Sequence, residues 1–142
     1  MFNFTVKYLG FLKAVPPLPF VFDGLLLMWS FLARPGLIDT LDEIESRVLH
    51  WDGASKTVHP YGGIQFNCNG KEVGHIHGNG LLDIRFSRKI KELLLADGKI
   101  QHHHVFKNSG WVSFYITGKA DADYAIKLLH NSYVKIRDGA TK

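Results

Sequence analysis

The sequence predicts an α+β fold in which an antiparallel sheet has helices packed mainly on one face. Apolar residues at helical spacing predict helices near residues 40–50, 87–97 and 121–134, and strict alternation predicts strands such as 64–68 and 111–116. Short turn signals join neighbouring strands as hairpins, and the regular alternation of strand and helix that indicates a parallel sheet is missing.

Length and composition predict one compact domain. The chain has 142 residues, of which 46% are apolar and 13% aromatic, enough for one hydrophobic core. Its single cysteine, Cys68, cannot form an internal disulfide, and no secretory leader opens the chain, so we expect a reducing, cytoplasmic setting. The net charge of +4 is mild and is spread along the chain apart from a short basic run at 85–91, so nucleic acid is not an expected partner.

The N-terminal region, residues 1–38, is the most apolar part of the chain. It is expected to form an arm and a helix that join the domain of residues 39–142 in one structural unit. Between Pro19 and Arg34 lie fourteen residues, interrupted by Asp23, whereas a membrane span needs about 20 apolar residues. We therefore expect a buried helix that covers part of the core.

A second interpretation of this helix stays open. Residues 19–33 could instead lie on a membrane surface or in the groove of a partner protein. Exposed side chains at Trp29 and Phe31 would favour that interpretation, because a buried helix has no reason to present large aromatic residues to solvent.

The helix predicted near 40–50 begins with a capping box formed by Thr40 and Glu43. Apolar residues follow at helical spacing up to Trp51. The next residues, 52–56, are polar and predict a turn that leads into the sheet.

Three strands are predicted next. Ile64, Phe66 and Cys68 alternate with polar residues, and Asn69-Gly70 is a strong signal for a two-residue hairpin turn. The second strand, within 71–78, ends at another Asn-Gly pair, after which the segment LLDIRF resumes the alternation.

Two helices and one further strand complete the predicted fold. Ser87 is placed to cap the helix near 87–97, and Gly98 is placed to end it. The segment GWVSFYITG predicts a strand, and Asp121 is placed to cap the last helix.

The residues with the clearest chemical potential are His75 and His77. They stand two apart in a strand, so both imidazoles leave the same face of the sheet. Acid–base work or a metal site also needs a third group, for which the candidates are His59, Asp83 and one of the histidines at 102–104. A lone His-x-His lacks the fixed spacing of known metal motifs, so we expect no metal.

A structural role is the alternative for each histidine, either at the solvent face of the hairpin or in a hydrogen bond to the backbone. We expect that role for His102 and His103, because consecutive residues in an irregular segment cannot all face one pocket. For His75 and His77 both interpretations stay open. Cys68 lies on the apolar side of its strand and is expected to be a buried hydrophobic residue rather than a nucleophile.

Three blocks of the sequence resemble the luciferase-domain family, named for the fungal luciferases. The blocks are HPYGGIQFNCNGKEVGHIHGNGLLDIRF, HHHVFKNSGWVSFYI and DADYAIKLLHNSY, and they extend from about Trp51 to Tyr133. The pattern GWVSFYI followed by LLHNSY is also similar, more loosely, to that of the MmcQ/YjbR family, which has an α+β fold. The first resemblance implies that molecular oxygen oxidises a hydroxypyrone-like enol without a metal or an organic cofactor.

The resemblance also implies which side chains form the pocket. The residues expected to act in catalysis are His75, His77 and His104, and those expected to bind the substrate are His59, Tyr61, Asn79, Asp83 and Trp111. A neutral histidine, either His75 or His77, would remove the enol proton, and the other would hold the oxyanion together with Asn79.

A non-catalytic binding module is the rival function. It would hold a small ligand, a protein or nucleic acid through the same face of the sheet. The basic run, formed by Arg85, Arg88, Lys89 and Lys91, favours this rival, whereas the paired histidines favour an enzyme.

Overall fold

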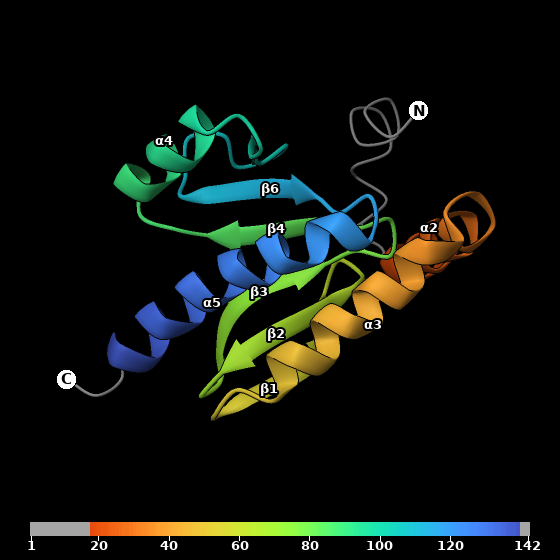
Figure 1. Ribbon diagram of the computed structural model, residues 1–142, viewed down its shortest axis with the longest axis horizontal. Coiled ribbons are helices and arrows are strands. Elements are labelled where there is room, and N and C mark those ends of the chain that lie inside the picture. Colours follow the sequence, from red (N-terminus) through yellow and green to blue (C-terminus); the bar gives the residue numbers. More distant parts are fainter. Residues whose placement is uncertain (1–17, 140–142) are drawn as a thin grey trace.

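The computed structural model describes residues 18–139, which form a six-stranded antiparallel sheet and four α-helices (Figure 1). The strand order is β1-β2-β3-β4-β6-β5. The strands are β1 (Ala54–Val58), β2 (Ile64–Cys68), β3 (Lys71–Ile76), β4 (Leu81–Arg85), β5 (Gln101–His102) and β6 (Trp111–Tyr115). The helices are α2 (Leu18–Ala33), α3 (Pro35–Leu49), α4 (Arg88–Ala96) and α5 (Ala122–Gly139). The predicted α+β class and antiparallel sheet are confirmed, and the predicted arm of residues 1–15 lies outside the described residues.

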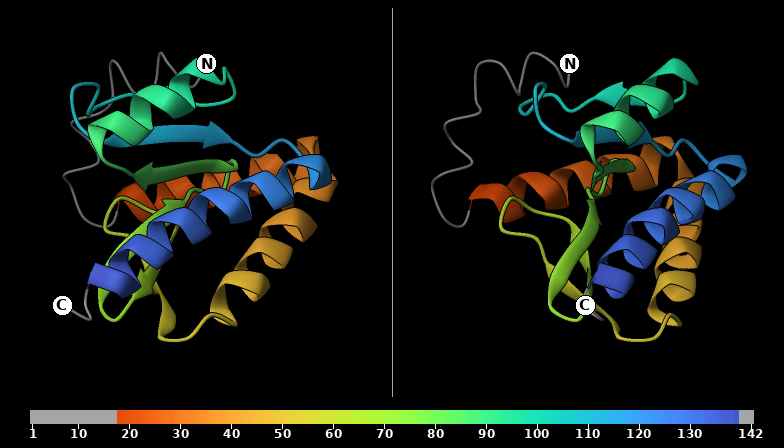
Figure 2. Two further views of the ribbon diagram at one scale, coloured as in Figure 1. Left: turned by 60° about the vertical axis from the view of Figure 1, so that its left-hand side comes forward. Right: turned by 90° about the vertical axis from the view of Figure 1, so that its left-hand side faces the viewer.

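One face of the sheet carries the hydrophobic core under α3 and α5. Figure 2 shows these two helices on one side of the sheet, while α2 approaches from the other side before it joins α3. Ile44 of α3 and Leu129 of α5 are fully buried against sheet residues such as Leu82. The second face of the sheet is therefore left for polar side chains and α2.

The turn and cap signals in the sequence are mostly confirmed. Asn69 and Gly70 both have positive φ, at 50° and 77°, which is the conformation that a two-residue hairpin loop between β2 and β3 requires. Ser87 accepts a hydrogen bond from the backbone N–H of Ile90 and so caps α4. Gly98 follows α4 with a φ of 76°, as expected for a residue that ends a helix.

Three local predictions are wrong. Helix α3 begins at Pro35, where proline is favoured in a first turn, and the Thr40 hydroxyl donates to the Gly36 carbonyl inside the helix instead of capping it. Residues 54–56, predicted as part of a turn, belong to the edge strand β1, whose mostly exposed side chains carry no apolar alternation. Asp121 bonds back to Thr117 and does not cap α5.

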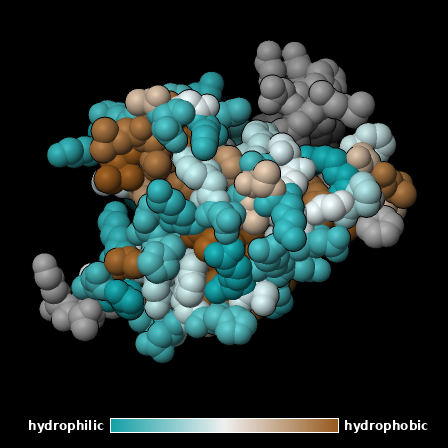
Figure 3. Space-filling view, viewed as in Figure 1, coloured by the Kyte–Doolittle hydropathy of each residue, from teal (hydrophilic) through white to brown (hydrophobic). Residues whose placement is uncertain are grey.

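Helix α2 is apolar but largely exposed. Its outward side chains include Trp29 and Leu32, which are 65% and 72% exposed, and no described residue of α2 joins the core cluster. The expectation of a buried helix is therefore wrong for these side chains. In Figure 3 apolar side chains reach the surface at the end of α2 and over α4. Within residues 18–139, no helix is both long and apolar enough to cross a membrane.

The inward side of α2 meets the sheet at the loop after β3. Asp23 Oδ1 accepts a hydrogen bond from the backbone N–H of Gly78 at 3.0 Å. A Cβ atom on Gly78 would lie 2.9 Å from Leu27, so only glycine allows this approach. These contacts hold α2 over the polar face of the sheet.

Candidate functional site

Three neighbouring strands carry the centre of the site side by side. In the antiparallel register His75 of β3 pairs with Asp83 of β4, and Asp83 pairs in turn with Ser113 of β6. Their chain neighbours Gly74 and Ile84 face α5 and the core. Alternation therefore directs the side chains of the site to the other face of the sheet, the face on which α2 lies.

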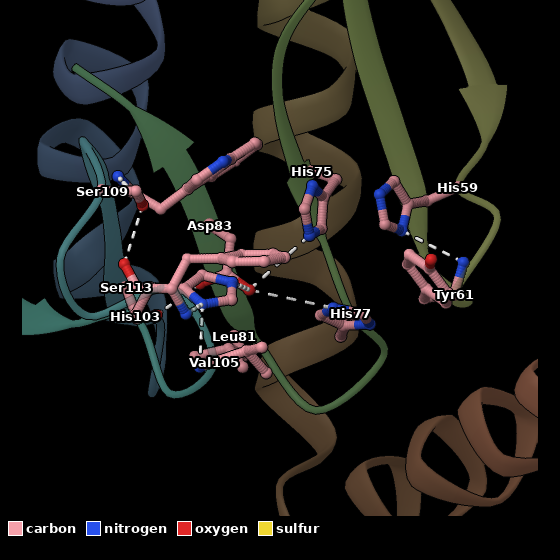
Figure 4. Close-up of polar contacts among 12 residues, drawn as sticks. His59, Tyr61, His75, His77, Leu81, Asp83, His103, Val105, Ser109 and Ser113 are labelled. Atoms are coloured by element: carbon pink, nitrogen blue, oxygen red, sulfur yellow. Dashed lines mark hydrogen bonds and ion pairs between the residues drawn. The ribbon is translucent and has the colours of Figure 1, made fainter. Parts of the chain in front are cut away.

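The Asp83 carboxylate is the focus of the site and is fully buried (Figure 4). Its Oδ1 atom accepts a short hydrogen bond from the Ser113 hydroxyl. Its Oδ2 atom faces three imidazole Nε2 atoms, those of His75 at 3.6 Å, His77 at 3.9 Å and His103 at 3.6 Å. None of the three is within hydrogen-bond distance, and Oδ2 has no other hydrogen-bond partner among the described residues. Buried carboxylate oxygens are rarely left in this state.

His75 is held between two carboxylates. Its Nδ1 atom lies 2.6 Å from Glu72 Oε1, and its Nε2 atom faces Asp83. A β-bulge between Phe66 and Asn67 shifts the register of β2 and β3, so that Glu72 comes to the same face as His75. Burial lowers the pKa of His75, but contacts with the two carboxylates outweigh it, and the pKa is raised overall.

His77 lies just beyond β3 and is placed by the loop that leads to β4. Its backbone N–H donates to the Leu81 carbonyl at 2.9 Å. Its Nδ1 atom lies 3.7 Å from Asp23 Oδ1, while Nε2 points toward Asp83. Burial raises the pKa of Asp23, but His77 and the Gly78 N–H outweigh it and lower the pKa. A charged Asp23 therefore orients the His77 ring.

His103 has a defined tautomer. Its Nδ1 atom accepts hydrogen bonds from the backbone N–H groups of Val105 at 3.1 Å and Phe106 at 3.0 Å. The proton of the neutral ring must therefore be on Nε2, the atom that faces Asp83. Burial lowers the pKa of His103 more than the nearby Asp83 carboxylate raises it, so the ring is neutral.

Lys91 fixes the loop that carries His103. Its ammonium group donates to the carbonyls of Lys107 at 2.7 Å and Ser109 at 2.8 Å, and the side chain is 5% exposed. Lys91, one of the four cations of the basic run, is therefore buried and used in the fold. This weakens the nucleic-acid version of the rival function, which needs those charges on the surface.

His59 and Trp111 complete the group of side chains around Asp83, which we call the cluster. The His59 ring stacks on His75 with centroids 3.7 Å apart, and its Nδ1 atom accepts from the backbone N–H of Tyr61 at 3.3 Å. Burial, followed by the positive charge of His75, lowers the pKa of His59 to about 4, so His59 is neutral at pH 7. The Trp111 ring lies 5.6 Å from His75 and 5.8 Å from His103.

A small recess lies between the cluster and α2. It is lined by Phe22, Asp23, Leu26, Tyr61, His77, Leu81 and His104. Its free volume of about 10 Å³ is close to the minimum for one water molecule. A planar organic ligand would therefore have to displace α2 or reach the cluster from another side.

The structure brings most of the predicted site residues together. His59, His75, His77, Asp83 and Trp111 form one cluster, and Tyr61 and His104 line the adjoining recess. Asn79 is different, because its side-chain oxygen accepts from the Leu81 N–H within the turn between β3 and β4. This bond engages the side-chain oxygen, and the oxyanion role predicted for the Asn79 amide N–H stays a prediction.

Sequence reasoning missed three members of the cluster. His103 was expected to have a structural role, and its Nδ1 atom does accept backbone hydrogen bonds, but the ring is also 5% exposed and its Nε2 atom faces Asp83. Its neighbour His102 is exposed. Glu72 and Asp23 were not considered. The only available signal was their charge in otherwise apolar or strand-like segments.

Comparisons with known proteins agree with the resemblance stated from the sequence. A family model described as "Luciferase domain" matches residues 70–132. The matched segment contains His75, His77, Asp83 and His103, the four residues at the centre of the site. No curated protein and no solved structure matches the chain. The resemblance to the luciferase-domain family is therefore confirmed over this segment.

Proposed function

We propose, on the premise that residues 70–132 resemble the luciferase domain, that the protein is an oxidoreductase in which molecular oxygen oxidises an enolic, hydroxypyrone-like small molecule. The observation that supports this proposal is the convergence of three imidazoles on the buried Asp83 carboxylate. Perturbed titratable groups gathered in one buried place are typical of catalytic sites rather than of a structural hairpin.

The chemistry requires a base, and the geometry narrows the choice of base. His103 carries its proton on Nε2. Nδ1 of His75 lies within hydrogen-bond distance of Glu72, whereas neither nitrogen of His77 comes that close to a carboxylate. The histidines that line the recess are His77 and His104, so one of these two removes the enol proton.

The reaction then proceeds in three balanced steps. Loss of the enol proton to the imidazole gives an enolate, whose electron-rich carbon adds to dioxygen. A carbon–oxygen bond forms, and dioxygen is reduced to the peroxide level by the electrons of the enolate. The imidazolium returns its proton to the peroxide, so the first product is a hydroperoxide with the composition of enol plus oxygen. A dry site favours this sequence, because water would otherwise protonate the enolate.

Oxygen consumption with a panel of hydroxypyrones and related enols tests the proposal. We expect the wild-type protein to consume oxygen with at least one member of the panel, and the variant of the residue that acts as base, His77→Gln or His104→Gln, to lose about 10²–10⁴-fold in rate. His102→Gln is the matched control, because His102 is exposed and outside the cluster. The proposal fails if no enol is consumed, or if both variants match the control.

The same panel of enols distinguishes the enzyme from the rival function, a non-catalytic binding module for a small ligand. A ligand held at about a hundredfold its Kd should stabilise the protein by about 2.7 kcal/mol in a thermal-shift assay. Stabilisation by an enol without any consumption of oxygen would establish the rival.

For α2 we propose a membrane surface as the partner. Val21, Leu25, Met28, Trp29 and Leu32 recur at helical spacing and are all more than half exposed; we call this set the α2 stripe. Tryptophan and leucine on one face of a helix are suited to the boundary between lipid headgroups and acyl chains. The net charge of +4 favours an anionic surface, and the single, buried Cys68 favours the cytoplasmic side.

We expect Trp29→Glu/Leu32→Glu to abolish binding to anionic vesicles and to leave Tm unchanged. Each apolar side chain is worth about 1.5–3 kcal/mol when buried, so losing two should weaken binding by more than a hundredfold. Co-sedimentation with vesicles measures the binding, and a melting curve measures Tm. Val58→Glu is the control, because Val58 is 68% exposed on β1, outside the α2 stripe. A large fall in Tm would contradict the proposal, because it would show that the α2 stripe contributes to the stability of the fold.

A further inference from the structure

The geometry points to a metal site: we infer that His75, His77 and Asp83 bind one divalent first-row transition ion, such as Fe²⁺ or Zn²⁺. The ligand atoms would be the Nε2 atoms of the two imidazoles and Oδ2 of the carboxylate, all of which lie within 4.8 Å of one another. This inference stands on the arrangement of the side chains and does not depend on the oxidation proposed above.

The distances between the ligand atoms fit one ion. Metal–nitrogen and metal–oxygen bonds of about 2.0–2.2 Å place neighbouring ligands about 3.0–3.5 Å apart in octahedral or tetrahedral sites. The Nε2 atoms of His75 and His77 lie 3.6 Å and 3.9 Å from Asp83 Oδ2. A contraction of a few tenths of an ångström brings each of these two pairs to the spacing of ligands on one ion, and the two imidazole ligand atoms, which lie within 4.8 Å of each other, would have to close further by rotation of the side chains.

The Asp83 carboxylate supplies an independent observation. Oδ2 is fully buried and has no hydrogen-bond partner among residues 18–139, although Oδ1 is satisfied by Ser113. Leaving a buried carboxylate oxygen without a hydrogen bond costs folding free energy, because the oxygen has lost its contacts with water. The same oxygen is fully used when it binds a cation.

The outer carboxylates orient both imidazoles as metal ligands. Ligating histidines almost always donate their second ring N–H to a carboxylate or carbonyl, which fixes the tautomer and leaves the other nitrogen free to bind. Glu72 takes this position behind His75, 2.6 Å from Nδ1. Asp23, held by the Gly78 N–H, lies behind His77 at 3.7 Å from Nδ1, and a small rotation of the ring would bring it to hydrogen-bond distance. In both rings the nitrogen left for the ion is Nε2, the one that faces Asp83.

Two other groupings of potential ligands in the described part of the chain are poorer. In the first, of His59, Glu72 and His75, the two rings stack face to face at 3.7 Å, so their lone pairs lie side by side rather than converging. In the second, of Asp83, His103 and His104, Nδ1 of His103 accepts two backbone hydrogen bonds, which requires the proton to remain on Nε2. Neither set can bring three lone pairs to one point without breaking these contacts.

A metal here departs from the expectation drawn from the sequence, which was a metal-free pocket. The His-x-His spacing alone gives no sign of Asp83 in the adjacent strand or of the carboxylates behind the rings. Two imidazoles and one carboxylate are also the donor set of mononuclear non-haem iron sites. With an ion on Nε2 of His77, the base of the proposed oxidation would be His104, the other histidine of the recess.

The test is a titration of the chelator-treated, full-length protein with Zn²⁺ by calorimetry and with Co²⁺ by visible absorption. We expect one equivalent of each ion, with a Co²⁺ spectrum typical of nitrogen and oxygen ligands. His75→Gln, His77→Gln and Asp83→Asn should each weaken binding by more than a hundredfold, while Glu72→Gln should weaken it by about 10–100-fold. His102→Gln and His104→Gln should bind as the wild type does, and circular dichroism should show that every variant is folded.

Each contrary result has a defined meaning. Absence of one-equivalent binding in the wild type overturns the site. Wild-type affinity in Asp83→Asn overturns this ligand set, because the ion would then be held elsewhere. Failure of the oxidation is a separate result: a protein that binds the ion but consumes no oxygen keeps the metal site and loses the proposed function.

Discussion

Asp83→Asn is expected to abolish the oxidation of an enolic substrate, with a loss of about 10³-fold or more in kcat/KM. The substitution keeps the volume of the side chain, and its oxygen can still accept the Ser113 hydroxyl. It removes the negative charge and replaces Oδ2 with an N–H donor, which would face the Nε2 proton of His103. The three imidazoles would then lose the negative charge that they share.

Ser113→Ala is the matched comparison for this prediction. It removes one hydrogen bond from Asp83 Oδ1 but leaves the charge, so we expect a loss of less than about tenfold. Steady-state oxygen consumption gives kcat/KM for both variants, and a melting curve shows whether each variant is folded. Equal losses in the two variants would show that the hydrogen bond, and not the charge, governs the site.

Gly110→Ala is expected to lower Tm by roughly 5–15 °C. A Cβ atom at this position would lie 1.9 Å from the Phe86 carbonyl oxygen, far inside van der Waals contact. The Phe86 N–H also donates to the Gly110 carbonyl at 2.9 Å, so the two backbones are tied together and cannot separate freely. Overpacking of this kind costs about 1–3 kcal/mol, and a clash with backbone belongs at the upper end.

Gly118→Ala is the control for the steric effect. A Cβ atom there would meet no heavy atom within 4 Å, and the backbone is extended, so thermal unfolding should be nearly unchanged. Equal melting temperatures for Gly110→Ala and the wild type would contradict this prediction. They would show that the backbones of Phe86 and Gly110 can move apart despite their hydrogen bond.

Local chemistry explains how much of the fold could be predicted from the sequence. The turn at Asn69-Gly70, the cap at Ser87 and the strand 111–115 depend on a few neighbouring residues, and all three are confirmed. Strand β1 could not be predicted, because its side chains are mostly exposed and its only signal is pairing with β2. Helix α2 was misjudged because apolar sequence does not say whether its surface is covered.

The candidate site was predictable only in the parts that one strand determines. Alternation places His75 and His77 on one face, and the structure agrees. Contacts made through the bulge between β2 and β3 or through α2 depend on tertiary placement, and so Glu72 and Asp23 were missed. His103 faces Asp83 because two backbone N–H groups turn its ring, a detail that no periodicity encodes.

Helix α2 has two faces that act on different surroundings. On its inner face Asp23 lies next to His77, and on its outer face Trp29 and Leu32 are exposed to solvent. A membrane surface that displaced α2 would move Asp23 with it, and by thermodynamic linkage the affinity of the histidine cluster for its ligand would then change. The coupling is reciprocal, so occupation of the cluster should change vesicle affinity by the same factor, and Asp23→Asn should reduce that factor toward one.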